Sequence, residues 1–209
     1  MLICGVDEAG RGPMIGPLVI AGVAIEKSKI KELEAIGVRD SKKLAPHVRE
    51  KLYKKITKLA DDYSVLRISP KRVDAHVQNH QLNLLEASCM SKIIKRLQPS
   101  VSYVDSCDVN PVRFGKLLTE MSKTGKVKSY HKADSRFVVV AAASIIAKVT
   151  RDRAIARLNK EYELGSGYPS DARSVKFVKE WFSKHQQMPE FVRKSWAPVK
   201  LVAESYALM

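Results

Sequence analysis

The sequence predicts an α/β fold in which a mixed sheet is flanked by helices and followed by a small helical C-terminal extension. Two observations lead to this fold class. Short apolar runs typical of strands come first and close together, and further along the chain they alternate with helical patterns. The 209 residues, 45% of them hydrophobic, also suffice for one domain with a sizeable core. No apolar run approaches the ~20 residues of a membrane span.

Five runs have the length and composition of strands. They are Leu2–Val6, Leu18–Ile25, Tyr63–Ile68, Val101–Val104 and Val127–Tyr130. Apolar residues at helical spacing predict helices between and after these runs. These helices start at Pro46, run over Leu82–Leu97 and Pro111–Met121, and continue over Val138–Leu158 and Ser174–Lys184. The stretch from Val138 is rich in alanine and almost wholly apolar through Ile146, so we expect it to be buried against the sheet. Gly165–Pro169 interrupts the pattern, which predicts a main domain over residues 1–165 and a helical extension packed on it over residues 166–209.

The net charge of +15 and the pI near 9.8 favour a polyanionic partner, most often a nucleic acid. The alternative is a basic surface that serves only solubility. Cys4, Cys89 and Cys107 are widely spaced and contain no CxxC pattern, which argues against a disulfide framework or a zinc site. No basic stretch precedes the apolar start, so we expect no signal peptide and a cytoplasmic location.

Four acidic residues lie at or just beyond the C-terminal ends of predicted strands. They are Asp7, Glu8, Asp105 and Asp134. Functional groups of open α/β sheets gather at strand ends, and a cluster of carboxylates repels itself unless a hard divalent cation binds. Oxygen ligands favour Mg²⁺ or Mn²⁺, and two such ions support in-line phosphoryl displacement. The alternative is four unrelated acids, of which Asp134 would be an ordinary helix N-cap.

The turn Gly10-Arg11-Gly12 follows the first two acids directly. Two glycines around an arginine let backbone amides and a guanidinium approach a phosphate closely. Carboxylates beside a phosphate-binding turn indicate phosphodiester chemistry. Elsewhere, Lys42 and Lys148 are candidate phosphate contacts, or parts of a solvated basic face.

Two further residues have open roles in the sequence. Tyr168 lies in a Gly/Pro loop, where it is either a platform for a sugar or an anchor of the loop. His131 either assists near the metal site or serves structure.

Six segments in order along the chain resemble the motifs of the type 2 ribonucleases H (ribonuclease HII), in an archaeal-like single-subunit form. They are Asp7–Pro13 with Gly16-Pro17, Asp40–Leu44, Tyr103–Asp105, His131–Asp134 with Ala142–Asp152, Gly165–Asp171 and Arg193–Trp196. The segment Phe137–Ala141 departs from the family, which usually has proline and serine there, and we expect it to alter the entry into the helix.

The resemblance implies the ribonuclease H fold and a metal-dependent endoribonuclease. The family cleaves the RNA strand of RNA/DNA hybrids and also cuts 5′ of ribonucleotides embedded in duplex DNA. The implied reaction is two-metal in-line hydrolysis with Mg²⁺ or Mn²⁺, leaving 3′-hydroxyl and 5′-phosphate ends, in DNA replication and repair.

The resemblance also implies roles for single residues. The four acids would be both catalytic residues and metal ligands, Gly10, Arg11 and Gly12 would contact the ribonucleotide 2′-OH and the backbone, and Tyr168 would lie against the next sugar. We expect a monomer. The last residues lack the glutamine and aromatic pair of a sliding-clamp peptide, so the sequence does not predict clamp binding.

Two other classes of function compete with this interpretation. A resolvase, an integrase or a type 1 ribonuclease H also uses carboxylates at strand ends, but lacks the Gly-Arg-Gly turn and the Gly-Tyr-Pro loop. A non-catalytic nucleic-acid-binding module would be expected to have lost some of the acids, and all four are present.

Overall fold

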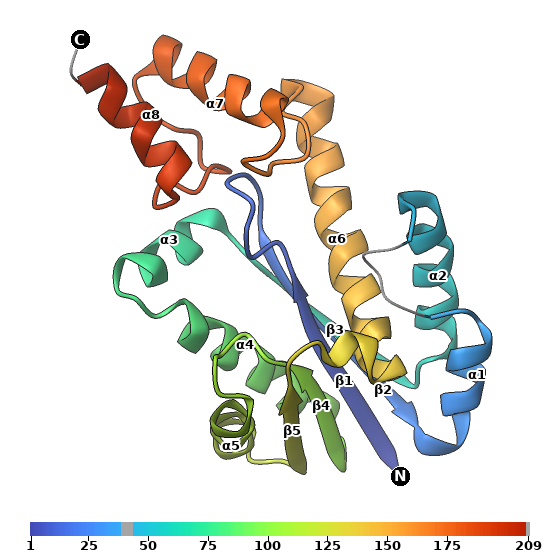
Figure 1. Ribbon diagram of the computed structural model, residues 1–209. Coiled ribbons are helices and arrows are strands. Elements are labelled where there is room, and N and C mark those ends of the chain that lie inside the picture. The colour runs from blue at the N-terminus through green and yellow to red at the C-terminus, as the bar shows by residue number, and fades with distance from the viewer. Residues whose placement is uncertain (39–43, 208–209) are drawn as a thin grey trace. The chain divides into compact units, whose positions relative to one another are not determined.

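The computed structural model describes residues 1–38 and 44–207 and contains one five-stranded sheet among them (Figure 1). The strands are β1 (Leu2–Ala9), β2 (Leu18–Glu26), β3 (Asp62–Ile68), β4 (Val101–Asp105) and β5 (Lys126–Tyr130). Their order in the sheet is β3-β2-β1-β4-β5. β1 pairs antiparallel with β2 and parallel with β4, and β4 pairs parallel with β5. The predicted mixed sheet is therefore confirmed.

The described residues also form eight α-helices, which lie between and after the strands in the sequence. They are α1 (Ile30–Ala35), α2 (Pro46–Leu59), α3 (Pro70–Gln78), α4 (Leu82–Leu97), α5 (Pro111–Ser122), α6 (Val138–Tyr162), α7 (Ala172–His185) and α8 (Ala197–Ala207), with short 3-10 turns η1 (Lys27–Lys29) and η3 (Ala133–Ser135). Among the described residues, none of the helices combines the length and the hydropathy that a membrane crossing requires.

The chain divides into two compact units. Unit 1 comprises Met1–Ala9, Val19–Leu66 and Asn83–Val149, and unit 2 comprises Gly10–Leu18, Arg67–Leu82 and Thr150–Met209. β3 and α6 each contribute residues to both units. The domain boundary expected at residue 165 stays a prediction.

Two glycines show which helices cover the faces of the unit 1 sheet. A Cβ on Gly5 of β1 would collide with the backbone of Val139 in α6, so α6 lies directly against one face. A Cβ on Gly22 of β2 would meet Ile93 and Leu97 of α4, so α4 packs on the opposite face. The sheet is therefore the middle of three layers.

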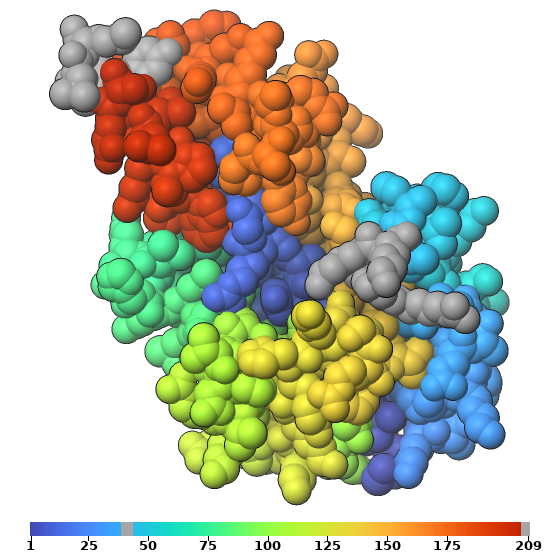
Figure 2. Space-filling model, in the orientation of Figure 1, coloured from blue at the N-terminus to red at the C-terminus, as the bar shows by residue number. Residues whose placement is uncertain are grey.

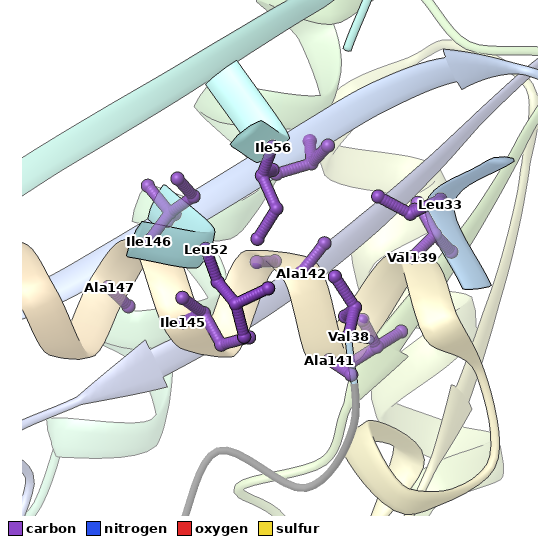
Figure 3. Packing of buried hydrophobic residues seen from close by; sticks show 14 of the residues in the cluster. Leu33, Val38, Leu52, Ile56, Val139, Ala141, Ala142, Ile145, Ile146 and Ala147 are labelled. Atoms are coloured by element: carbon purple, nitrogen blue, oxygen red, sulfur yellow. The ribbon is translucent and has the colours of Figure 1, made fainter. Parts of the chain in front are cut away.

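The core on the α6 face combines inward residues of β1 and β2 with α1, α2 and the first half of α6 (Figure 3). In Figure 3, Leu33, Leu52 and Ile56 approach α6 where it presents Ala142, Ile145 and other small or branched side chains. The predicted burial of this helix is confirmed, since its residues from Val139 to Ala147 are buried. Small side chains along α6 are what allow the helix to approach the strands closely.

Unit 2 has a core of its own. Met14, Ile15 and Val192 pack there with apolar residues of α6, α7 and α8. An isolated β-bridge joins Ile15 to Val192. Residues 14–15 and 191–193 are thus held together although they lie far apart in the sequence.

The sequence did not predict helices α1 and α3. α1 has six residues, too few for a periodic pattern to stand out. α3 carries a signal that was overlooked, because Ser69 accepts a hydrogen bond from the Arg72 amide and Pro70 occupies the first turn. Cys4 and Cys89 are buried as small core residues, as predicted.

Because α6 lies so close to β1, we expect an added methyl group to destabilise the protein more at Gly5 than at a less crowded glycine. We expect Gly5→Ala to lower the free energy of unfolding by roughly 1–3 kcal/mol, because the rigid backbone of Val139 occupies the space. Gly115→Ala is the matched control. A Cβ on Gly115 would lie 3.3 Å from its nearest neighbours, so we expect this variant to lose less stability than Gly5→Ala. Urea denaturation of both variants measures the difference, and an equal loss would contradict the close approach at Gly5.

Candidate active site

The strand register brings Asp7 and Asp105 to the same edge of the sheet. Val6 pairs with Val104 in the parallel β1–β4 ladder, and the two aspartates are the next residues of their strands. In the neighbouring ladder Asp105 pairs with Tyr130, the last residue of β5. Asp134 follows four residues later. Two carboxylates therefore lie near the C-terminal ends of the adjacent parallel strands β1 and β4, and the third lies just beyond the end of β5.

Asp7 is buried on the α6 face of the sheet, with 4% of its surface exposed. Burial, followed by repulsion from Asp105 and more weakly from Asp134, raises the pKa of the Asp7 carboxyl from 3.8 to about 7. A hydrogen bond with Ser144 of α6 and one donated by the Glu8 amide to Oδ1 at 2.7 Å partly oppose this rise in pKa. The three aspartates thus lie close enough to interact electrostatically.

The other two aspartates are fixed by the chain around them. Asp105 Oδ1 accepts a hydrogen bond from the Ala133 amide at 2.7 Å, which ties the end of β4 to the turn that carries Asp134. Asp134 is buried in η3, four residues before α6 begins at Val138. It is therefore not the N-cap of α6, which was the alternative left open by the sequence.

Glu8 differs from its neighbour Asp7. Successive side chains of a strand point to opposite faces, so Glu8 is on the side of Val6 and α4 while Asp7 is on the side of α6. The Asp7-Glu8 pair thus presents one carboxylate to each face at the end of β1.

The carboxylates have the chemistry that a hard divalent cation requires. In the described part of the chain, no group of three or more His, Cys, Asp and Glu side chains is arranged so that it could hold a metal ion as it stands. The repulsion that raises the pKa of Asp7 is nevertheless what a cation would relieve, and the donors are all carboxylate oxygens. Asp7, Asp105 and Asp134 therefore fit Mg²⁺ or Mn²⁺ as ligands.

The Gly10–Gly12 turn belongs to unit 2, where the buried Arg193 and the partly buried Trp196 bind its carbonyl groups. The Arg193 guanidinium donates to the carbonyl oxygens of Gly10 at 2.6 Å and Arg11 at 3.0 Å. It also donates to Gly16, at 3.1 and 3.2 Å. Trp196 Nε1 donates to the Gly12 carbonyl at 3.0 Å. Three successive carbonyl groups are thus turned toward the protein.

The orientation of these carbonyls determines where the amides point. In a planar trans peptide the N–H is opposite to the C=O, so the N–H groups of Arg11 and Gly12 point away from Arg193 and Trp196. Gly10 has φ +89°, and a Cβ on it would collide with the Pro17 carbonyl. The turn therefore requires glycine at this position and directs two backbone donors outward, as an anion or a hydroxyl ligand needs.

Tyr168 lies beside this turn within unit 2. A Cβ on the exposed Gly12 would be 3.9 Å from Tyr168 Cε1. The guanidinium of Arg151 lies 4.7 Å from the centre of the Tyr168 ring, and Arg151 also donates to the Ser166 carbonyl at 2.5 Å. Arg151 is 3% exposed, so it supports the Tyr168 loop from beneath and does not extend into solvent as a phosphate contact.

The remaining candidates are placed as follows. Lys148 is half-buried in α6, on unit 1. Lys42 lies outside the described residues. His131 is exposed, and its Nε2 lies 3.4 Å from the Val109 carbonyl. The structure thus gives His131 a contact with a loop carbonyl.

Sequence reasoning missed the supporting roles of four residues. They are Ser144, Arg151, Arg193 and Trp196. The last two belong to a segment whose resemblance to a family motif was noticed, but no local pattern connects them to a turn about 180 residues earlier in the chain. Ser144 carries a weak signal, as a hydroxyl in an otherwise apolar helical stretch.

Comparisons with known proteins identify relatives over the whole chain. Residues 4–199 match the family model described as ribonuclease HII. The ribonuclease HII of Cenarchaeum symbiosum is 56% identical over 202 residues, which cover 97% of this chain and 98% of the relative. The crystal structure of ribonuclease H2 from Pyrococcus horikoshii superposes with a TM-score of 0.94 at 44% identity and covers 99% of both chains. A ribonuclease HII from Archaeoglobus fulgidus, solved in a complex with PCNA, gives 0.87 at 43% identity, over 94% of this chain and 95% of the other.

The raised pKa of Asp7 predicts how stability depends on pH without metal. Asp7 binds its proton more tightly in the folded than in the unfolded state, so its ionisation lowers stability as pH rises from about 4 to about 7. Asp7→Asn removes this loss, and we expect its advantage in free energy of unfolding to grow by on the order of 2 kcal/mol between pH ~5 and ~8. Denaturation in chelator measures this, with Asp62→Asn as the control. An Asp7→Asn variant that is less stable than wild type at both pH values would show that the carboxylate serves structure.

Proposed function

Because the chain belongs to the ribonuclease HII family, we propose that Asp7, Glu8, Asp105 and Asp134 are the catalytic residues of its endoribonuclease activity on RNA/DNA hybrids. The observation that carries the assignment is the convergence of carboxylates at the ends of β1, β4 and β5, with a charge repulsion that a cation would relieve. We also propose that the enzyme cuts on the 5′ side of single ribonucleotides embedded in duplex DNA.

The proposed reaction uses two Mg²⁺ or Mn²⁺ ions held by these carboxylates. When bound, such ions activate a water molecule and stabilise the leaving 3′-oxygen, which yields 3′-hydroxyl and 5′-phosphate ends. The protein's own contribution is to hold the carboxylates in place. The Ala133 amide fixes Asp105, and Ser144 with the Glu8 amide fixes Asp7.

We propose that the Gly10–Gly12 turn and the loop that carries Tyr168, both in unit 2, recognise the substrate. The outward N–H groups of Arg11 and Gly12 are donors for the ribonucleotide 2′-OH or a flanking phosphate, and Tyr168 is a platform for the next sugar. The proximity of Gly12 to Tyr168 supports this pairing, since both would contact consecutive nucleotides. Lys42 and Lys148 remain proposed phosphate contacts.

The remaining assignments are cellular. We propose a monomeric, cytoplasmic enzyme of DNA replication and repair. The C-terminal residues do not predict clamp binding, but the relative from Archaeoglobus fulgidus was solved in a complex with PCNA, so this doubt about a sliding clamp is not confirmed.

The four acids predict a shared loss of activity. We expect Asp7→Asn, Glu8→Gln, Asp105→Asn and Asp134→Asn each to lower cleavage of an RNA/DNA hybrid by about 10²-fold or more, because the negative charge that holds the ions is reduced. Binding of the hybrid in chelator should be retained or improved, since a negative charge near phosphate is gone. Initial rates with Mg²⁺ and with Mn²⁺ measure the loss, with Asp62→Asn as the control. Near-normal turnover of Asp7→Asn or Asp105→Asn would refute the assignment.

The proposed role of Tyr168 predicts a change in substrate preference. We expect Tyr168→Ala to lose far more kcat/KM on a duplex with one ribonucleotide than on a long hybrid, because a long hybrid offers alternative registers. The measurement is the ratio of kcat/KM on the two substrates with the same metal. Tyr63→Ala, which removes an exposed tyrosine of β3, is the matched control. A constant ratio would reduce Tyr168 to a loop anchor and leave the nuclease assignment intact.

A further inference from the structure

Three aromatic rings stack on the α6 face of β4 and β5. Phe137 lies 4.4 Å from Tyr103 and 5.1 Å from Tyr130, measured between ring centres. Tyr103 lies in β4 and Tyr130 in β5, and Phe137 is the residue just before α6. All three are only partly buried. We call these three residues the aromatic platform.

Two cations lie over the aromatic platform. The guanidinium of Arg136 is 4.5 Å from the Tyr130 ring centre and 5.5 Å from that of Phe137, and Lys128 Nζ is 5.9 Å from the Tyr103 ring centre. Arg136 is exposed, so its outer edge is open to a ligand.

Neither Arg136 nor Lys128 forms an ion pair within residues 1–38 and 44–207. Two other exposed arginines are paired with carboxylates instead. Arg113 is paired with Asp108, and Arg173 with Asp171. Among the described residues, the two positive charges on the aromatic platform thus contact rings and no carboxylate.

The aromatic platform adjoins the catalytic carboxylates within unit 1. Tyr130 pairs directly with Asp105, so their backbones are one strand spacing apart, about 4.8 Å. Arg136 follows Asp134 by two residues. Figure 2 shows the segment around residues 130–136, in yellow, on the visible face of the molecule.

The positive lining continues along the outer edge of β5. A groove of about 480 Å³ between α5 and β5 is lined by Lys116, Lys126 and Lys128, with Glu120 as the acidic residue among its walls. A polyanion that reaches the aromatic platform would therefore meet further positive charge beyond it.

We propose that Arg136 and Lys128 form a phosphate-binding site that holds a backbone phosphate of the substrate other than the one that is cleaved. The aromatic rings restrict the guanidinium to one plane, so it binds an anion with less loss of rotamer freedom than a free surface arginine. Cations beside a cluster of carboxylates also offset the repulsion between those carboxylates and an approaching polyanion. This proposal rests on the proposed function, because that function supplies the polyanion.

The experiment measures binding of an RNA/DNA hybrid in chelator over a range of salt concentrations, so that it does not depend on cleavage. We expect Arg136→Gln to weaken binding by about 5- to 20-fold at low salt and to reduce the slope of log affinity against log salt by roughly 0.9. Arg136→Lys, which keeps the charge, should restore the slope. Lys31→Gln removes an exposed cation of α1 and is the charge-matched control.

A second measurement locates the contact. Hybrids with a single neutral methylphosphonate are scanned along each strand against wild type and Arg136→Gln. One position should weaken wild-type binding and have no further effect on the variant. If Arg136→Gln and Lys31→Gln lose affinity and slope equally, or if no position shows this non-additivity, the proposal is overturned. A parallel assay of wild-type cleavage with Mg²⁺ tests the proposed function separately. The binding experiment does not depend on cleavage, so one proposal can fail without the other.

Discussion

The repulsion among Asp7, Asp105 and Asp134, of which Asp7 and Asp134 are buried, is the constraint on which the rest of unit 1 depends. Asp7 can be buried next to Asp105 and Asp134 only if the surrounding chain supplies donors and fixes the backbone. The Ala133 amide and the Ser144 side chain provide these contacts, and both come from the segment that leads into α6 or from α6 itself. The approach of this helix to the sheet is therefore part of the site.

The close approach of α6 has its origin in small residues on both sides of the contact. Gly5 leaves room for the backbone of Val139, and alanines follow along the buried face of the helix. Val138 and Ala141 both belong to the packing of this layer, and the Ala141 amide donates to the Phe137 carbonyl at 3.0 Å in the first turn. Phe137 is thereby held where it also completes the aromatic platform.

The sequence predicted well what depends on local patterns. The five strands, the burial of α6 and the location of Asp7 and Asp105 near the C-terminal ends of their strands all follow from apolar runs and from the residues that interrupt them. β1 continues to Ala9, beyond the predicted end at Val6, because Asp7 and Glu8 still pair with Ala21 and Ile20 of β2. A rule that ends a strand at its first charged residue fails where backbone pairing continues.

What the sequence could not predict depends on contacts between distant segments. The outward direction of the Arg11 and Gly12 amides is set by Arg193 and Trp196, which are more than 180 residues away in the chain. The fully buried guanidinium of Arg193 donates to three carbonyl groups within residues 10–16, so backbone oxygens take the place of water around the charge. These hydrogen bonds offset the cost of burying the Arg193 guanidinium. They also mean that the shape of the proposed substrate-reading turn is determined by the C-terminal segment as much as by its own glycines.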